Sequence, residues 1–241
     1  MRSPRLFVED LREGAATVRL GPREAHHLGT VLRLGPGARV RVFGSAAGEF
    51  EAEIRALDRR GVELALLGRI RPPQPARGPD LWFAPIRRQR LEWLIEKATE
   101  LGVRRLVPVV TRHTVVEPRR PERLRLIAVE AAEQCGRLDV PDLAEPRPLF
   151  EALAQRPAER PLLFADERGD ASPLLAALGR LGTEAVDLLV GPEGGFSEEE
   201  RARLREMPEV VPVSLGPTIL RAETAALFAL SVVRAFAETR P

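Results

Sequence analysis

The sequence contains little cysteine, histidine and lysine, and it has no tyrosine or asparagine. Its single cysteine, Cys135, cannot form an internal disulfide or supply a cysteine-only metal cluster. Two of the three histidines, His26 and His27, are adjacent, and this spacing does not match that of metal ligands. We therefore expect a protein with no disulfide framework and no bound metal.

Long apolar runs are also missing. None approaches the roughly 20 residues that a membrane-spanning helix requires, and no apolar signal-peptide core follows Met1. The expectation is a soluble, cytoplasmic protein that does not enter a membrane. A chain of 241 residues with 44% hydrophobic content can bury one sizeable core or two modest ones.

The charge is distributed unevenly along the chain, although the net charge is only +2. Residues 1–140 contain 26 basic and 18 acidic residues, whereas residues 141–241 contain 11 and 17. Lys97 is the only lysine, so the basic charge is almost all arginine. A basic amino-terminal part fits a polyanionic partner, and arginine suits phosphates and stacked bases. A GC-rich genome would give the same arginine bias without functional meaning.

A proline-rich segment, residues 72–79, divides the chain, because its prolines favour extended backbone. Before it, residues 1–71 contain short alternating apolar segments separated by glycine-rich turns, which predicts a small β-barrel. The strand candidates of this barrel are residues 18–20, 39–43, 49–56 and 62–67, with a helix over 24–32. On pattern alone, a PUA-like and an OB-like barrel are equally compatible.

After the linker, residues 80–241 alternate strand and helix patterns, which predicts an α/β domain with a parallel sheet covered on both faces. The strand candidates are residues 81–85, 106–110, 161–165, 186–190 and 210–215. The helix candidates are residues 89–101, 121–137, 172–180, 197–206 and 222–237.

Two motifs carry most of the functional information: LVGPEGGFS at residues 189–197 and SLGPTILRAET at residues 214–224. Each follows a predicted strand and precedes a helix, so both lie at carboxyl ends of strands, where open α/β sheets bind ligands. They match neither the dinucleotide fingerprint nor the Walker A loop. Ser197 and Glu200 form a predicted capping box. Glu193, Arg221 and Glu223 are charges that a purely structural turn does not need.

These motifs, with KATELGV at 97–103, EQCGR at 133–137 and HHLGTVLRLGPGARVRVFG at 26–44, resemble the bacterial 16S ribosomal RNA uracil-N3 methyltransferases. That family belongs to the SPOUT class. The resemblance spans nearly the whole chain and implies a PUA-like RNA-binding barrel followed by a SPOUT domain, a parallel-sheet α/β fold with a trefoil knot. One departure is Thr218, where the family often has a basic residue.

The resemblance implies S-adenosyl-L-methionine as cofactor and assigns a set of site residues. The cofactor-binding residues that it implies are Phe164, Ala165, Val190, Gly191, Pro192, Glu193, Gly194, Gly195, Leu215, Gly216, Ile219 and Leu220. Arg221, Glu223 and Glu193 are the candidate catalytic residues, with the two glutamates as alternative general bases. The candidate RNA contacts are Arg5, His27, Arg33, Arg87, Arg88 and Arg137.

The function that follows as an expectation is methylation of N3 of one uridine in the decoding region of 16S rRNA. The expected partners are 16S rRNA, in the small ribosomal subunit, and a second copy of the chain, because SPOUT enzymes generally work as homodimers and the apolar helix at 225–236 offers a face. Alternatives are a SPOUT methyltransferase acting on tRNA or another rRNA nucleotide, a non-catalytic ribosome-assembly factor, and a plain nucleotide-binding domain.

Overall fold

The protein is described by a computed structural model that covers residues 3–116, 121–157, 159–168 and 170–239. The chain forms two compact units. One comprises Met1–Ala76 and Ala132–Val140, and the other comprises Arg77–Ala131 and Pro141–Pro241. The short segment Ala132–Val140 thus belongs to the unit that contains the amino terminus.

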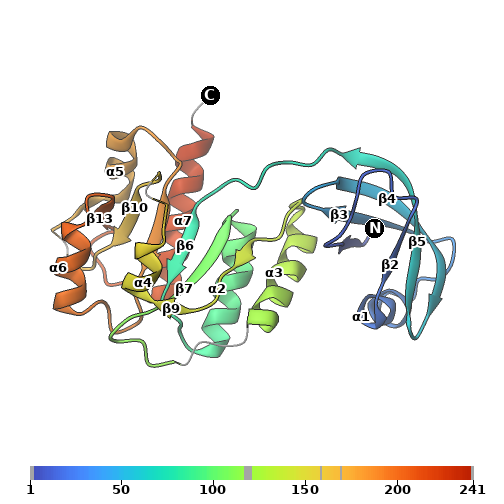
Figure 1. Ribbon diagram of the computed structural model, residues 1–241, viewed down its shortest axis with the longest axis horizontal. Coiled ribbons are helices and arrows are strands. Elements are labelled where there is room, and N and C mark those ends of the chain that lie inside the picture. The colour runs from blue at the N-terminus through green and yellow to red at the C-terminus, as the bar shows by residue number, and fades with distance from the viewer. Residues whose placement is uncertain (1–2, 117–120, 158, 169, 240–241) are drawn as a thin grey trace. The chain divides into compact units, whose positions relative to one another are not determined.

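The amino-terminal unit is built on a five-stranded sheet of order β1-β3-β4-β5-β2 (Figure 1). Its strands are β1 (Arg5–Phe7), β2 (Thr17–Leu20), β3 (Arg39–Gly44), β4 (Gly48–Asp58) and β5 (Gly61–Arg71). Neighbouring strands are antiparallel except β1, which runs parallel to β3. The four expected strands are confirmed. The sequence pattern misses β1, because three residues are too few to show a period.

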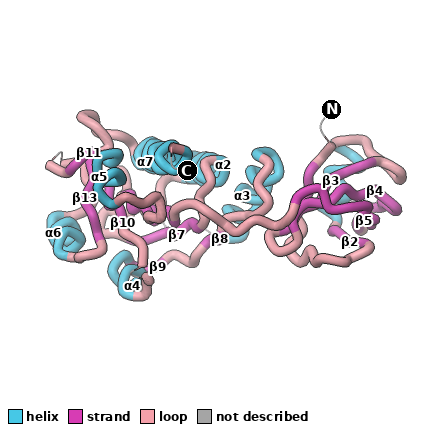
Figure 2. Tube along the Cα trace, turned by 90° about the horizontal axis from the view of Figure 1, so that it is seen from above, coloured by secondary structure: helices cyan, strands magenta, loops and turns pink. Residues whose placement is uncertain are grey.

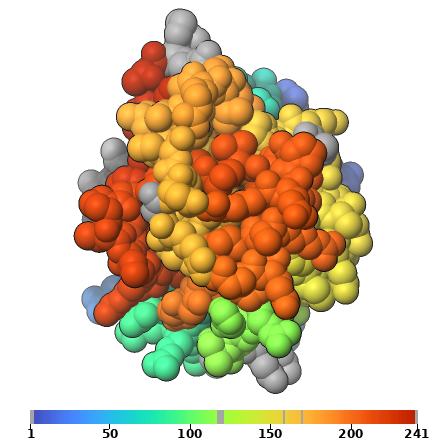
Figure 3. Space-filling view, turned by 90° about the vertical axis from the view of Figure 1, so that its left-hand side faces the viewer, coloured from blue at the N-terminus to red at the C-terminus, as the bar shows by residue number. Residues whose placement is uncertain are grey.

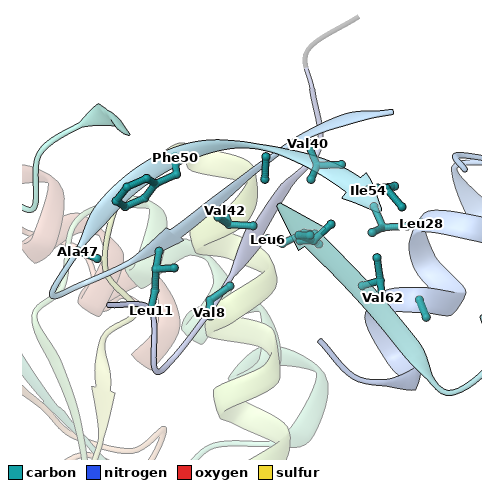
Figure 4. Packing of buried hydrophobic residues seen from close by; sticks show 13 residues of the cluster. Leu6, Val8, Leu11, Leu28, Val40, Val42, Ala47, Phe50, Ile54 and Val62 are labelled. Carbon is teal, nitrogen blue, oxygen red and sulfur yellow. The ribbon is translucent and has the colours of Figure 1, made fainter. Parts of the chain in front are cut away.

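Between β2 and β3, helix α1 (Pro22–His26) continues directly into a π-helical turn, η1 (His27–Val31). The core of this unit is formed by alternate residues of the sheet together with Leu28 of η1, as Figure 4 shows. Val40 and Val42 of β3 and Ile54 of β4 are among its buried members. The period-2 alternation of the sequence thus places one face of each strand in the core.

The second unit contains an eight-stranded sheet in which every strand pair is parallel. Its order is β11-β13-β10-β12-β6-β7-β8, and β9 also pairs with β7. The strands are β6 (Asp80–Phe83), β7 (Arg105–Val110), β8 (Asp142–Leu143), β9 (Arg147–Pro148), β10 (Leu162–Ala165), β11 (Ser172–Pro173), β12 (Asp187–Val190) and β13 (Val210–Ser214). The expected parallel α/β fold class is confirmed.

Helices cover both faces of this sheet, as Figure 2 shows. They are α2 (Arg88–Glu100), α3 (Pro121–Cys135), α4 (Leu149–Ala154), α5 (Leu174–Leu181), α6 (Glu198–Glu206) and α7 (Ala222–Glu238). Helix α7 packs against α2 and α5 on one face. On the other face, α4 and α6 share a core cluster with Trp82, Phe164 and Leu189 of the sheet. Helix α4 is too short to give a clear sequence pattern.

The expected linker lies between β5, which ends at Arg71, and β6, which begins at Asp80. Residues 132–140, at the end of α3 and beyond, pack with the amino-terminal unit. Phe43, Ala132 and Leu138 form a buried cluster there. Among the described residues, no helix combines the length and apolarity that crossing a membrane would need.

Candidate functional site

The two motif loops lie at the same edge of the parallel sheet. The glycine loop, residues 191–197, follows β12, and the second loop, residues 215–221, follows β13. In the sheet order β10 separates these strands, and all three are parallel. Their carboxyl ends therefore meet at one edge, which is where such sheets bind ligands.

The structure of the glycine loop explains why two of its positions, Gly191 and Gly195, need glycine. A Cβ at Gly191 would lie 2.7 Å from the Phe196 ring, and one at Gly195 would lie 2.5 Å from Glu167 Oε1. Gly195 also has a φ of +66° and donates its N–H to the Pro192 carbonyl at 2.9 Å. Gly191 is thus required by the Phe196 ring, whereas Gly195 is required by its positive φ, because the end of the flexible Glu167 side chain can move away.

The predicted capping box at the end of this loop is confirmed. The Glu200 N–H donates to Ser197 Oγ at 3.2 Å, and the Ser197 N–H donates to Glu200 Oε2 at 2.9 Å. The cap fixes where α6 begins, so it also fixes the exit of the glycine loop.

The second loop is the more open of the two. Gly216 has a φ of +120°, a conformation that favours glycine, yet no heavy atom lies within 4 Å of the position of a Cβ there. The Gly216 N–H donates to Ser214 Oγ at 3.2 Å, which holds the turn. Ile219 is 87% exposed, and Thr218 is exposed beside it. An apolar side chain this exposed suits contact with a ligand or a partner.

Three charged side chains meet where these loops approach α2. Arg90 Nη1 lies 3.8 Å from Glu193 Oε1, and Arg90 Nε lies 3.6 Å from Glu223 Oε1. Glu223 is 7% exposed, and its buried Oε2 has no hydrogen-bond partner in the described structure. Such an orphaned acceptor is uncommon and calls for a donor from a ligand or a rearrangement. One arginine thus joins the two glutamates that the sequence leaves as alternative bases.

Arg221 is the N-cap residue of α7, with extended backbone and no side-chain cap bond. It is exposed and has no ion-pair partner among the residues that the structure describes. Arg221 and Glu223 are therefore not a mutual surface ion pair. A cation at a helix amino terminus is unfavourable unless an anion is present.

Arg87 and Arg88 are exposed at the start of α2, at the same sheet edge. Arg88 Nε donates to Glu92 Oε1 at 2.9 Å, and Arg123 Nε donates to the same oxygen at 2.7 Å. The hydrogen bonds from Arg123 and then Arg88 lower the pKa of Glu92 to about 2. Arg87 stays at the N-cap position without a side-chain cap bond.

Phe164 and Ala165 end β10 between the two loops, as the sequence predicts for that strand. The Phe164 side chain is fully buried, and its ring meets that of Phe196 edge-on at 5.0 Å. A ligand at this edge would meet Phe164 through its backbone. Beyond β10, Asp166 forms ion pairs with Arg201 and Arg205 of α6.

The other candidate RNA contacts lie in the amino-terminal unit and divide into two groups. His27 and Arg33 are exposed, and Arg33 has a φ of 55°. Arg5 is instead 11% exposed and donates to Glu49 Oε1 and to the Arg137 carbonyl, both at 2.6 Å. Arg137 pairs with Asp139 at 2.7 Å and is also largely buried. Arg5 and Arg137 thus serve the packing of this unit, which a linear pattern of basic residues does not reveal.

His113, for which no sequence motif suggests a role, lies against the glycine loop. The feature of the sequence that could have pointed to His113 is its position just after the end of β7, at the same edge of the sheet. Among the described residues, no group of three or more His, Cys, Asp or Glu side chains is placed to hold a metal ion.

Residues 75–234 match the family model of the RNA methyltransferase domain, and residues 20–67 match that of the RNA methyltransferase PUA domain. The chain belongs to the RNA methyltransferase family. The first match includes both motif loops and the Arg90 cluster.

Relatives in this RNA methyltransferase family match nearly the whole chain. Ribosomal RNA small subunit methyltransferase E of Rickettsia conorii is 30% identical over 97% of this chain and 96% of its own. The protein of the same name from Bacillus subtilis is 30% identical over 95% of both chains. The resemblance drawn from the motifs is confirmed.

Solved structures agree in fold. Ribosomal RNA small subunit methyltransferase E of Neisseria gonorrhoeae, bound to S-adenosyl methionine, has a TM-score of 0.83 at 26% identity and covers 98% of both chains. A Legionella pneumophila protein in complex with SAM has a TM-score of 0.85 at 28% identity, with the same coverage of both chains.

Proposed function

We propose that this RNA methyltransferase transfers a methyl group from S-adenosyl-L-methionine to N3 of a specific uridine in the decoding region of 16S rRNA. The observation that carries the proposal is the meeting of both motif loops with the Arg90, Glu193 and Glu223 cluster at one sheet edge. The names of the relatives support the rRNA substrate, and the cofactor of the N. gonorrhoeae protein supports the methyl donor.

The residues of this edge fit the cofactor. The open space at Gly216, the exposed Ile219 and the backbone of residues 190–195 suit a flat heterocycle with its attached sulfonium amino acid. We assign the holding of the cofactor to Phe164, Ala165, Val190, Gly191, Pro192, Glu193, Gly194, Gly195, Leu215, Gly216, Ile219 and Leu220. When bound, S-adenosyl-L-methionine supplies the methyl group, and the chain supplies position and proton transfer.

The protein's chemical task is to remove the N3 proton of uracil and to stabilise the charge that develops on the two carbonyl oxygens. Glu223 is the stronger candidate base, because its Oε2 is buried and receives no hydrogen bond from the residues that the structure describes, whereas the Glu193 side chain is about one-third exposed. Arg90 holds both carboxylates at the site. Arg221, which pairs with no acidic side chain in the described parts of the chain, is placed to donate to a uracil carbonyl as that oxygen gains charge.

RNA contacts are assigned to the exposed side chains of His27 and Arg33 in the PUA domain and of Arg87 and Arg88 at the edge of the active site. Their phosphate contacts would make affinity fall with salt. We place the protein in the cytoplasm with the ribosome and infer that it acts as a homodimer.

Mapping methylated nucleotides in 16S rRNA from cells with and without the gene tests the substrate directly. Loss of one N3-methyluridine, restored by the purified protein and S-adenosyl-L-methionine, is the expected result. A mark that disappears instead from tRNA or from another rRNA nucleotide would establish a different substrate for the same fold. No change in any RNA would favour a non-catalytic assembly factor.

Arg221→Ala tests the catalytic assignment. The single-turnover methylation rate should fall on the order of 10²-fold, the scale for losing one preorganised donor, while cofactor binding is kept. Arg221→Lys should recover little, because an ammonium lacks the planar fork. A near-normal rate in Arg221→Ala would reduce Arg221 to a helix-terminus residue.

A further inference from the structure

The segment that follows β7 contacts the glycine loop that follows β12, although β7 and β12 are not neighbours in the sheet. In the sheet, β6 lies between β7 and β12. The segment at residues 111–114 therefore passes the end of β6 to reach residues 194–200. In Figure 3 the green of this segment adjoins the orange of the glycine loop along the lower edge of the molecule.

The first contact is made by the His113 side chain. Its Nδ1 lies 3.1 Å from the Gly194 carbonyl oxygen and 3.2 Å from that of Gly195. A carbonyl oxygen only accepts hydrogen bonds, so Nδ1 carries the hydrogen and donates to this pair. The His113 Cβ is also 3.2 Å from the position that a Cβ of Gly194 would occupy. The imidazole therefore lies directly against the backbone of the loop.

The second contact is made by the neighbouring backbone. The Arg112 N–H donates to Glu200 Oε1 at 2.8 Å, while Oε2 of the same carboxylate closes the capping box. The segment is itself held in a turn, because the Thr111 N–H donates to Thr114 Oγ1 at 2.9 Å. His113 thus contacts the middle of the glycine loop, and the Arg112 backbone binds Glu200, whose carboxylate caps the helix that follows the loop.

We propose that His113 is a positioning residue that fixes the Gly194 and Gly195 carbonyls and so keeps the glycine loop in its ligand-binding conformation. The proposal rests on the function proposed above, in which this loop holds S-adenosyl-L-methionine. The loop contains three glycines, whose backbone can adopt many conformations, so a donor from outside the loop helps to select one of them.

Replacing His113 by Asn and by Asp, two side chains of the same size and shape as each other, separates the effect of the hydrogen-bond donor from that of side-chain packing. In His113→Asn, the side-chain amide can place an N–H near the position of the imidazole Nδ1–H. In His113→Asp, a group of the same size only accepts and is repelled by both carbonyls. Calorimetry should show the dissociation constant of S-adenosyl-L-methionine raised about tenfold or more in His113→Asp and changed no more than about threefold in His113→Asn.

Hydrogen exchange of the cofactor-free protein measures the conformational stability of the glycine loop independently of cofactor binding. Peptides spanning residues 190–197 should exchange faster in His113→Asp than in His113→Asn and the wild type. His26→Asp, at an exposed histidine of the other unit, is the matched control for the added charge and should leave both measurements unchanged.

The outcomes separate the inference from the proposed function. Wild-type affinity and exchange in His113→Asp would overturn the role of His113. Equal impairment of both variants would also overturn it, because packing rather than donation would then matter. A wild-type protein that does not bind S-adenosyl-L-methionine would contradict the proposed function, while the exchange measurement would still decide whether His113 holds the loop.

Discussion

Gly216 and Gly191 illustrate two different reasons for a glycine at the same site. Gly191 is required because the Phe196 ring occupies the space of a side chain, whereas the space beside Gly216 is open. A side chain at position 191 therefore disturbs the protein itself. A side chain at position 216 projects into the region assigned to the cofactor and adds about 1–3 kcal/mol of backbone strain at its positive φ.

From this difference we expect Gly216→Val to abolish S-adenosyl-L-methionine binding with a modest loss of stability. Gly191→Val should instead lower the melting temperature strongly, because the added atoms collide with a buried ring. Calorimetry and thermal melts of both variants provide the comparison. Wild-type affinity in Gly216→Val would remove the second loop from the cofactor site.

Glu49 is a fully buried carboxylate held by two arginines of the amino-terminal unit. Arg5 Nε and Arg71 Nε donate to its two oxygens, each at 2.6 Å. Burial by itself raises the pKa of Glu49, but the hydrogen bonds and the charges of Arg71 and Arg5 together outweigh it and hold the pKa below its ordinary value of 4.5. A depressed pKa contributes stability that is present above pH 4.5 and is lost as the pH falls through the folded-state value.

Glu49→Gln should therefore lower the free energy of unfolding at pH 7 by about 3–5 kcal/mol, because it leaves Arg5 buried without its anion. The difference from the wild type should shrink as the pH is lowered below 4.5. Urea titrations across this range measure it. Glu63→Gln is the control, since Glu63 pairs with an exposed Arg19 and should change stability by at most about 1 kcal/mol. A pH-independent difference between the wild type and Glu49→Gln would contradict the assignment.

At the scale of elements, the last turn of α3 and the residues after it act as part of the amino-terminal unit. Arg5 donates to the carbonyls of Ala132 and Glu133, both at 2.9 Å. Leu138 is 4% exposed and packs in the cluster that buries Phe43. The amino-terminal sheet thus depends on a segment that lies far along the chain.

Residues 1–76 alone should for this reason melt roughly 10 °C below the same residues joined by a flexible linker to 132–140. The estimate assumes the loss of about 2 kcal/mol of apolar burial in a small domain. Circular dichroism melts of the two fragments make the comparison, with Leu138→Asp in the linked fragment as control. Equal melting temperatures would show that the sheet is complete without this segment.

At the scale of the whole molecule, the proposed homodimer has a candidate surface on two helices that pack together. Trp93 of α2 is 46% exposed and Phe228 of α7 is 44% exposed. Large apolar side chains that are this exposed favour contact with an apolar surface of a partner. The apolar carboxyl-terminal helix that the sequence suggests as an interface is α7, which begins at Ala222.

We expect Phe228→Asp to weaken dimerisation at least tenfold, measured by sedimentation velocity over a range of concentrations. Leu175→Asp, at a 60% exposed leucine of α5, is the control for adding a charge at an exposed apolar position. A wild-type protein that remains monomeric at high concentration would contradict the proposed assembly.

The sequence by itself determined the features that depend on neighbouring residues. The strand and helix periods predicted a small amino-terminal β-barrel and a parallel α/β unit, and the Ser197 and Glu200 pair defined the start of α6. The motif order identified the RNA methyltransferase family. Because parallel strands share one carboxyl edge, the order of strands and motifs along the chain also predicted that the two motif loops would lie at the same edge of the sheet.

Only the tertiary structure decided which side chains have partners from distant parts of the chain. His113 meets Gly194 across 81 positions, and Arg5 meets the Ala132 carbonyl across 127. Arg90 joins Glu193 to Glu223 in the same way. The sequence does not reveal whether a basic side chain is exposed to solvent or donates hydrogen bonds to buried carbonyl groups. That depends on which surfaces the folded core brings into contact, and the local pattern does not contain this information.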